Sequence, residues 1–347
     1  MRLFLSFGCL IAALLALAAP PPDKAPAAAD QLIRYESHLE AMGGLYSIVV
    51  YGPDRTKLEA AVNSAFEEIE RLDQLLSNYK PTSAWSEVNR NAGKRAVPVP
   101  DELYRLLDAC LDYSRRSEGA FDITVGPLMK VWGFYKGTGR LPHRAEVRTA
   151  LAQVGSRHIG LDPAARAVRF ARPGVDMDPG GIGKGYAVDR AVAVLRQSGI
   201  SSGFISAATS TVYGIGVPPG DARGWEVRIV HPKNRNQTVA ALHLKDESMS
   251  TSGNYEKFFV AGGRIYSHIM NPRTGYPAEG MLQVSVVAPR ALDSEAWTKP
   301  IYINGSAWFA RARRTDQQLK QLRAYACAAV GRGRAGEGWD TQCAWLQ

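Results

Sequence analysis

The sequence predicts an α+β fold, because helical and strand-like segments mix along the chain without a regular strand–helix–strand alternation. The chain has 347 residues, of which 46% are hydrophobic and 22% are charged, which is enough for one large core or two coupled lobes. No internal repeat of useful length divides the sequence. Composition and length together indicate an ordinary globular protein.

The N-terminus predicts a secretory signal peptide over residues 1–18, followed by a linker over 19–31. The segment MRLFLSFGCLIAALLALAA has one arginine, an apolar run, and small residues at Ala16 and Ala18, so we expect cleavage after Ala18. A membrane anchor is the alternative, but the apolar run is short for a membrane span. The linker is rich in Pro and Ala. We therefore expect an exported, periplasmic protein, either free or associated with the inner membrane.

The elements that follow are predicted from the spacing of apolar residues. A strand is expected over 44–52, and helices over 56–79, roughly 101–117 and 184–199. The segment AFDITVGPLMKVWGFY, 120–135, is punctuated by Gly and Pro and indicates a loop over a surface. Further strands are expected near 167–170, 203–206, 225–230, 238–244, 256–266 and 282–288.

The net charge of +9 does not indicate a nucleic-acid partner. Much of the excess lies in the last forty residues, around RARR and GRGR. The sequence has no basic stripe interleaved with aromatic residues and no zinc-finger or helix-turn-helix spacing.

Three cysteines remain once the signal peptide is removed. Cys327 and Cys343 lie close together in the sequence and can close a loop in an oxidising compartment. Cys110 lies in an amphipathic helical pattern, where a buried free thiol is expected.

The stretch VDMDPGGIGKGYAVDRAV, 175–192, has the parts of a phosphate-binding loop. It fails the P-loop pattern, because Gly185 follows Lys184 where Ser or Thr is needed and Asp178 occupies the first glycine position. It also lacks the third glycine of the dinucleotide-binding pattern. Glycines, a helix start and Lys184 still suit a bound anion. The alternative is a tight strand-to-helix turn with a solvated lysine.

Two closely spaced segments add polar candidates. SMSTSGNYEKFF reads as a hydroxyl-rich turn that leads into a strand. YSHIMNPRTGYP places His268 near Arg273 and Thr274, and these groups can contact phosphate or transfer protons.

Six ordered segments, taken together, give the sequence a family resemblance. They are MGG, SNYKPTSAWSEVN, GAFDITVGPL, DPGGIGKGYAVD, TSGNYEKFF and SHIMNPRTGYP, and they run from about Met42 to Gly305. In this order they resemble the ApbE-type FAD:protein FMN transferase family. The resemblance implies one α+β, T-fold-related catalytic domain over 32–310 with mixed sheets and flanking helices. A basic C-terminal tail over 311–347, which a disulfide can close, would follow.

The resemblance also implies a Mg²⁺-dependent reaction of FAD. A Thr or Ser hydroxyl of an exported or membrane-anchored target protein would attack the FMN-side phosphorus, and AMP would leave. By position, the residues expected to contact FAD are Met42, Tyr79, Ala120, Phe121, Asp122, Asp178, Lys184, His268 and Ile269. His268 is the candidate for proton transfer, and Lys184 is the candidate for stabilising phosphate charge. Gly181 would bind the metal through its carbonyl.

Two departures from the family pattern affect this interpretation. Ala208, Thr209 and Ser210 stand where the family has a Gly-Gly-Asp-like turn. In ALDSEAWTKPIYING, alignment on Gly305 puts Glu295 at the family's metal-binding Asp and Lys299 at its Thr, while Pro300 interrupts the predicted helix. Thr298 is the neighbouring hydroxyl that can substitute, so the predicted metal ligands are Gly181, Glu295 and Thr298. The alternative is a degraded metal site.

Two other functions remain open at this point. One is an FAD pyrophosphatase that uses water as acceptor and gives FMN and AMP. The other is a non-catalytic periplasmic flavin-binding protein, which the altered turn and Lys299 favour.

Overall fold

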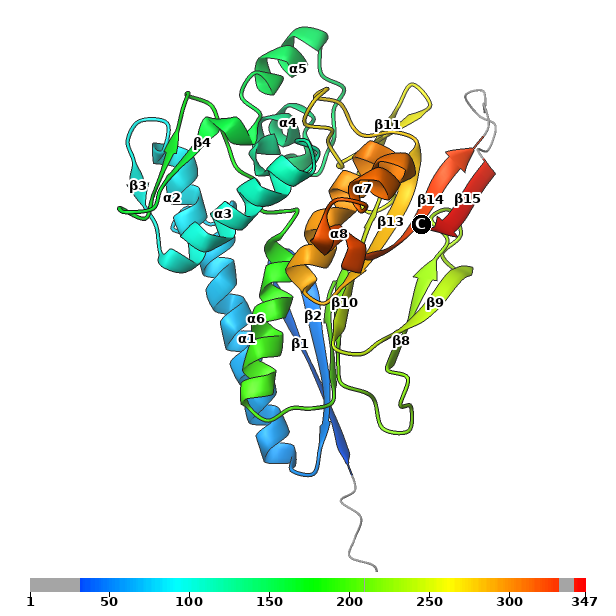
Figure 1. Cartoon of the computed structure of the whole chain (residues 1–347). Coiled ribbons are helices and arrows are strands. Elements are labelled where there is room, and N and C mark those ends of the chain that lie inside the picture. The colour runs from blue at the N-terminus through cyan, green and yellow to red at the C-terminus, as the bar shows by residue number, and fades with distance from the viewer. Residues whose placement is uncertain (1–31, 209, 331–339) are drawn as a thin grey trace, which may run out of the picture. The chain divides into compact units, whose positions relative to one another are not determined.

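The computed structural model describes residues 32–208, 210–330 and 340–347, and its main sheet confirms the predicted α+β class (Figure 1). This sheet has eight antiparallel strands in the order β1-β2-β6-β7-β10-β13-β14-β15. They are β1 (Ile33–Ala41), β2 (Gly44–Gly52), β6 (Gly203–Ala207), β7 (Thr211–Ile215), β10 (Glu247–Gly253), β13 (Met281–Ala288), β14 (Arg323–Val330) and β15 (Asp340–Trp345).

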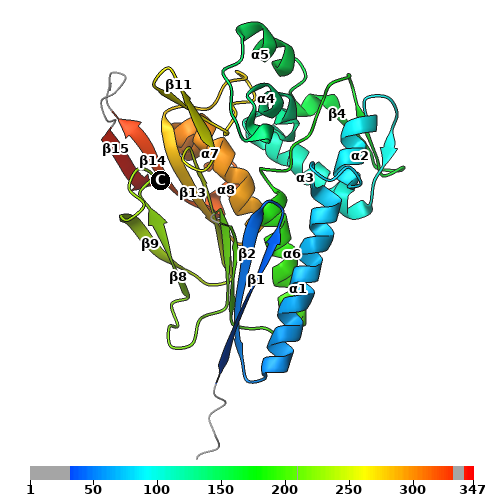
Figure 2. The same cartoon turned by 180° about the vertical axis from the view of Figure 1, so that it is seen from behind.

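Three long helices cover one face of this sheet (Figures 1 and 2). Contacts join α1 to β1 and β2, α6 to β6 and β7, and α7 to β10 and β13. These three are α1 (Arg55–Leu76), α6 (Gly183–Gln197) and α7 (Ala291–Ala312). The other helices of the described residues are α2 (Ala84–Asn91), α3 (Asp101–Arg116), α4 (Gly126–Val131), α5 (Arg144–Leu151) and α8 (Gln317–Gln321). Short 3-10 turns are η1 (Ile123–Val125), η2 (Phe134–Lys136) and η3 (Ser156–His158).

Small sheets complete the fold. A three-stranded sheet is formed by β3 (Val97–Pro98), β5 (Ala167–Phe170) and β4 (Ile159–Asp162). The hairpins are β8 (Trp225–Val230) with β9 (Thr238–Leu244), and β11 (Phe258–Ala261) with β12 (Arg264–Ser267).

The alternation of side chains along a strand explains how the sheet is covered on both faces. On β13, Val284 and Val286 pack in the core that includes α7, whereas Val287 packs with β8 and β9. On β10, Ser248 and Ser250 hydrogen-bond to Ser294 of α7. The helices therefore lie on one face and the β8–β9 hairpin on the other.

Several predicted elements differ from the structure. Residues 120–135 form η1, α4 and η2 rather than a surface loop, and SMSTSG belongs to β10 rather than to a turn. The strand expected over 256–266 is a hairpin, because Gly262 and Gly263 both have positive φ angles, 56° and 72°. Helix α7 continues through Pro300, and the non-helical residue inside it is Gly305, at φ 82°.

The C-terminal segment, which the sequence analysis set apart as a tail over 311–347, contributes α8, β14 and β15. Cys327 and Cys343 face each other in the β14–β15 register and form the expected disulfide. Cys110 is a buried free thiol, also as expected. The predicted signal peptide and linker, residues 1–31, lie outside the described residues. Within the described part of the chain, no helix has the length and apolar character needed to span a membrane.

Candidate active site

The glycine-rich turn before α6 is held in place by helix α2. The side-chain amide of Asn89 makes two hydrogen bonds to the backbone of Met177, at 2.8 and 2.9 Å, and the Trp85 indole N–H donates to the Met177 carbonyl at 3.0 Å. The chain then turns through Gly180 and Gly181 into α6, whose first turn contains the half-buried Lys184. Because the first N–H groups of a helix lack partners within it, this turn is suited to an anion.

The N-terminus of α6 packs very closely against α7. A β-carbon on Gly185 would lie 2.4 Å from the carbonyl oxygen of Ala291, so only glycine fits there. The closeness lets Glu295 of α7 accept the Gly185 N–H at 2.6 Å. In return, Asp189 of α6 accepts the N–H groups of Ala291 and Leu292 at 2.6 and 2.9 Å. Each helix thus supplies a carboxylate to the positive end of the other.

Asp178 lies at the other side of the turn, within a polar cluster. Its carboxylate accepts hydrogen bonds from the Tyr135 hydroxyl at 2.5 Å, from the Asn78 amide at 3.4 Å and from the Gly180 N–H at 2.6 Å. Desolvation by burial raises the pKa of Asp178 above its ordinary value. Tyr79 makes an edge-to-face contact with Tyr135 and is 68% exposed, so its ring lies at the protein surface beside the Asp178 cluster.

Two apolar side chains flank the glycine-rich turn. Met42 occupies the tight β1–β2 turn with φ 50°, followed by Gly43 at φ 72°. A β-carbon on Gly183 would lie 3.3 Å from Met42 Cε, and one on Gly181 would lie 3.4 Å from Phe121 Cε2. These short distances show that the glycine-rich turn packs against Met42 and the buried Phe121.

Two of the predicted FAD contacts lie next to Phe121 but are internally engaged. Ala120 is buried. The Asp122 carboxylate accepts the N–H and the hydroxyl of Thr124, at 2.8 and 2.5 Å, and the N–H of Ser156 at 2.7 Å. Asp122 thus caps η1 and ties it to the Ser156 turn, which is a structural role.

His268 follows β12 and lies close to several lysines. Its Nδ1 is 3.1 Å from the carbonyl oxygen of Lys257. Because a carbonyl can only accept, Nδ1 carries the proton in the neutral ring and Nε2 is left as an acceptor. Burial, together with Lys257, Lys299 and Lys184, lowers the pKa of His268 to about 4, so the ring is neutral at pH 7.

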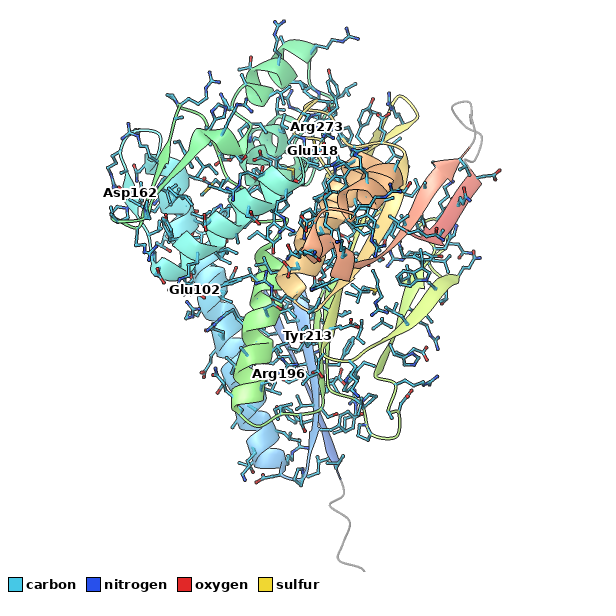
Figure 3. All side chains as sticks on the ribbon, viewed as in Figure 1. Glu102, Glu118, Asp162, Arg196, Tyr213 and Arg273 are labelled. Carbon is cyan, nitrogen blue, oxygen red and sulfur yellow. A yellow bond between two sulfur atoms is a disulfide. The ribbon has the colours of Figure 1, made fainter. Side chains whose placement is uncertain are left out.

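The other residues of the His268 segment are placed differently. Ile269 is buried and accepts the Ala278 N–H through its carbonyl. The Arg273 guanidinium donates to the Asn304 side chain at 2.5 Å and so ties this turn to α7. Figure 3 labels Arg273 near the upper end of the molecule.

Lys299 of α7 reaches the glycine-rich turn. Its Nζ lies 3.5 Å from the carbonyl oxygen of Gly181 and 3.3 Å from the carbonyl oxygen of Glu295. Burial lowers the pKa of Lys299, and Lys184 acts in the same direction, while Glu295, Glu256 and Asp178 act against it. The Thr298 hydroxyl is buried and fully engaged: it accepts from Ser252 at 2.8 Å and donates to the Glu295 carbonyl at 2.7 Å.

A family model now decides the relationship that the six segments suggested. The model of the ApbE family matches residues 42–323. The chain belongs to the ApbE family.

Curated members of the ApbE family are similar to this chain over most of its length. A protein named FAD:protein FMN transferase from Salmonella typhimurium is 30% identical over 346 residues, covering 96% of this chain and 93% of that protein. One of the same name from Klebsiella pneumoniae is 30% identical over 273 residues and covers 77% of each chain.

Solved structures of ApbE proteins share the fold. The ApbE protein from Thermotoga maritima has 29% identity and a TM-score of 0.76, covering 85% of this chain and 94% of that one. The apo flavinyl transferase ApbE from Pseudomonas stutzeri has 26% identity and a TM-score of 0.75, covering 90% and 95%.

The donors expected to bind metal in this ApbE-family chain do not form a metal site. The Thr298 hydroxyl is bonded to Ser252, the Glu295 carboxylate caps α6, and the Gly181 carbonyl faces the Lys299 ammonium. Mg²⁺ requires about six oxygen ligands near 2.1 Å in octahedral geometry. Among the described residues, no group of three or more His, Cys, Asp or Glu side chains is arranged to hold a metal ion.

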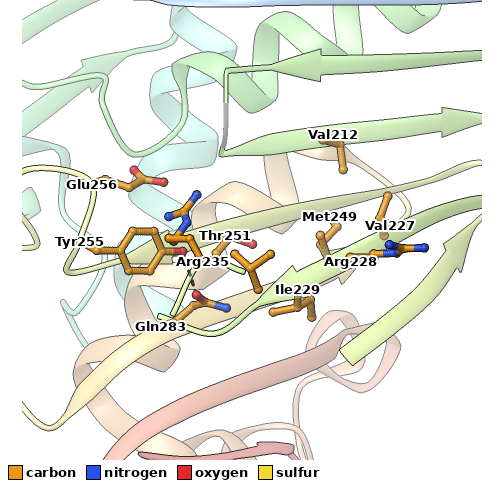
Figure 4. A pocket seen from close by; sticks show the side chains of 11 residues that line it. Val212, Val227, Arg228, Ile229, Arg235, Met249, Thr251, Tyr255, Glu256 and Gln283 are labelled. Carbon is orange, nitrogen blue, oxygen red and sulfur yellow. Dashed lines mark hydrogen bonds between the residues drawn. The ribbon is translucent and has the colours of Figure 1, made fainter. Parts of the chain in front are cut away.

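A pocket of about 230 Å³ lies between the β8–β9 hairpin and the main sheet (Figure 4). Arg235 stacks on the Tyr255 ring at 4.7 Å, and the Tyr255 hydroxyl donates to Gln283 at 2.8 Å. Glu256, at the same pocket, has a raised pKa because of burial, which Lys184 and Lys299 partly oppose. Glu256, which lines the pocket, therefore interacts electrostatically with Lys184 and Lys299.

Sequence reasoning missed several residues of this site. Glu256 and Lys257 lie within the quoted segment TSGNYEKFF but received no role. Asn78 and Tyr135, which hold Asp178, come from segments 100 and 43 residues away in the sequence. No local pattern signals such a contact.

Proposed function

We propose that this ApbE-family enzyme transfers FMN from FAD to a Thr or Ser hydroxyl of a target protein and releases AMP. Flavin transfer is supported by the relatives named FAD:protein FMN transferase, which match the chain over most of its length. The observation that carries the proposal is the geometry of His268: its Nδ1 lies 3.1 Å from the Lys257 carbonyl oxygen, which leaves Nε2 as the acceptor, and Lys184 at the start of α6 interacts electrostatically with the ring.

The α6 turn provides binding groups for a dinucleotide diphosphate. The positive end of α6 and the Lys184 ammonium stabilise negative charge on phosphate oxygens, although the N–H groups of Gly183 and Gly185 already donate to Pro179 and Glu295. Met42 lies beside the turn and offers apolar surface for the flavin ring, whereas Phe121 is buried in the core. Tyr79, which is exposed, offers a further aromatic surface.

In the proposed step, the acceptor hydroxyl oxygen forms a bond to the FMN-side phosphorus. The bond from this phosphorus to the bridging oxygen breaks, and AMP leaves with the electron pair. The hydroxyl proton passes to Nε2 of His268, which is unprotonated when Nδ1 donates to Lys257. FMN stays attached to the target through a phosphoester.

The family resemblance implied that the reaction depends on Mg²⁺, but no step of the reaction proposed here uses a metal ion. The Gly181 carbonyl faces the Lys299 ammonium, one Glu295 carboxylate oxygen accepts the Gly185 N–H, and the Thr298 hydroxyl is bonded to Ser252, so the donor set does not fit the ion.

The acceptor is proposed to be an exported or membrane-anchored protein. Support comes from the sequence of residues 1–18, which has the composition of a secretory signal, so enzyme and acceptor would meet in the periplasm.

The experiment combines purified enzyme, FAD and an exported protein domain that offers a Thr or Ser, and follows AMP by chromatography and acceptor mass. We expect AMP and flavinylated acceptor in equal amounts. AMP release at the same rate without acceptor would identify an FAD pyrophosphatase. FAD binding with no AMP under any condition would identify a flavin-binding protein.

A further inference from the structure

We propose that the Lys299 ammonium replaces the divalent cation beside the FAD diphosphate, so that this enzyme binds FAD and transfers FMN without a metal ion. The inference deepens the proposed function, on which it rests. Its basis is geometric: Nζ lies 3.5 Å from the carbonyl oxygen of Gly181, the atom expected to bind the metal ion.

The Lys299 side chain is held in this position by both elements that it touches. Its Nζ also lies 3.3 Å from the Glu295 carbonyl oxygen, one turn earlier in α7. A β-carbon on Gly181 would lie 3.8 Å from Lys299 Cε, so the stem packs against the glycine-rich turn. A charge held by a packed stem needs little ordering when the ligand arrives.

One oxygen of the carboxylate that would attract a metal ion is already engaged. Glu295 Oε2 accepts the Gly185 N–H at 2.6 Å and so stabilises the positive end of α6. A Mg²⁺ ion bound to the Gly181 carbonyl oxygen would share that carbonyl oxygen with the ammonium group of Lys299. Two cations on one neutral acceptor repel each other, which disfavours the ion.

The charges of the lysines match those of the ligand. Lys184 and Lys299 interact electrostatically, and both affect His268. Two ammonium groups close together are unfavourable without an anion, and the diphosphate of FAD carries two negative charges. Binding of the diphosphate therefore relieves the repulsion between the two ammonium groups.

The test compares metal-free enzyme with enzyme supplied with Mg²⁺. Wild-type protein is treated with EDTA, checked for metal by elemental analysis, and titrated with FAD in a calorimeter with EDTA or with excess Mg²⁺. We expect the same dissociation constant in both, within about twofold. An affinity that falls tenfold or more in EDTA and returns with Mg²⁺ overturns the proposal.

Variants of Lys299 distinguish the effect of its positive charge from the effect of its packed side-chain stem. Lys299→Met keeps the apolar stem and should weaken FAD binding in EDTA by about 10- to 150-fold, the range for losing one hydrogen bond to a charged group. Lys299→Arg keeps the charge and should retain more of the affinity. Lys57→Met is the matched control, since the Lys57 side chain is 83% exposed on α1. Normal FAD affinity of Lys299→Met in EDTA also overturns the proposal.

Transfer assays on the same samples distinguish this inference from the proposed function. Transfer by wild-type enzyme in EDTA supports both. If FAD binding is metal-independent and requires Lys299 but no acceptor is flavinylated, the cation assignment stands and the proposed function fails. Transfer that occurs only with Mg²⁺ retains the function and overturns the inference.

Discussion

The carboxylate of Glu295 accepts the backbone N–H of Gly185 at 2.6 Å across the contact between α7 and α6. This bond gives Glu295 a structural task in the position where a metal ligand was expected. A helix cap and a metal ligand respond differently to substitution, so the two roles can be separated.

We expect Glu295→Ala to lower the free energy of unfolding by about 0.5–2 kcal/mol, the usual cost of losing a cap. Glu295→Gln keeps an oxygen acceptor and loses only charge, so it should cost about 0.3–1 kcal/mol. Denaturant titrations with and without Mg²⁺ measure both effects. If Mg²⁺ stabilises the wild-type protein and this stabilisation disappears in Glu295→Gln, then Glu295 is a metal ligand.

Lys184→Met should slow FMN transfer by about 30- to 1000-fold, because a cation directed at phosphate in a site with little water stabilises the transition state by roughly 2–4 kcal/mol. The melting temperature should change little, since the removed charge lies on a partly exposed side chain. The measurement is the transfer rate at saturating FAD, with Lys57→Met as control. A near-normal rate in a folded variant would leave Lys184 as a solvated helix-start residue.

His268 should be neutral at pH 7 with its proton on Nδ1. Burial and the neighbouring lysines hold its pKa at about 4, below the unfolded value of 6.5. Nitrogen-15 NMR of labelled histidines reports both the tautomer and the pKa. A ring protonated at pH 7 contradicts its role as a base.

The same shift predicts the pH dependence of stability. Between pH 6.5 and about 4 the unfolded chain binds a proton at His268 that the folded chain does not, so folded protein loses stability as the pH falls. His268→Gln does not titrate there. The stability advantage of wild type over this variant should therefore shrink as the pH falls through this window. An advantage that is constant or grows would contradict the pKa.

Gly185→Ala should destabilise the protein even though alanine is the better helix former. Propensity alone would favour alanine by about 1 kcal/mol. The new β-carbon would lie 2.4 Å from the Ala291 carbonyl oxygen, and forcing α6 and α7 apart costs about 1–3 kcal/mol or more. Gly93→Ala is the control, since its nearest atoms would be 3.7 Å away. Thermal unfolding compares them, and equal melting temperatures would refute the close packing.

The helices and strands that could be predicted from the sequence are those that depend on contacts between residues close together in the chain. Helices α1, α3 and α6 carry apolar residues at helical spacing over many turns, and they were predicted close to their bounds. Strand β10, Glu247–Gly253, was missed because its buried face carries serines, whose hydroxyls bond to Ser294 of α7. Its identity as a strand depends on a helix more than forty residues later.

The candidate site shows the same division. Lys184 and the α6 start could be interpreted from the local glycine pattern, but the engagement of Glu295 with Gly185 spans 110 residues. The partner of Thr298 could not be predicted from spacing either. Residues three and four apart both lie beside Glu295 on α7, and the hydrogen bond from Ser252 of β10 to the Thr298 hydroxyl joins segments that are 46 residues apart.

The Cys327–Cys343 bond joins the last two strands of the main sheet, and β15 is the edge strand. An edge strand presents unpaired backbone groups that can recruit another chain. Under oxidising conditions the disulfide links β15 covalently to β14, whereas under reducing conditions β15 is held by backbone hydrogen bonds and by the contact between Trp345 and Tyr325. The edge of the main sheet is therefore covalently closed in an oxidising compartment, whereas β15 can separate from β14 in a reducing one. We expect the protein to self-associate more readily when this disulfide is reduced.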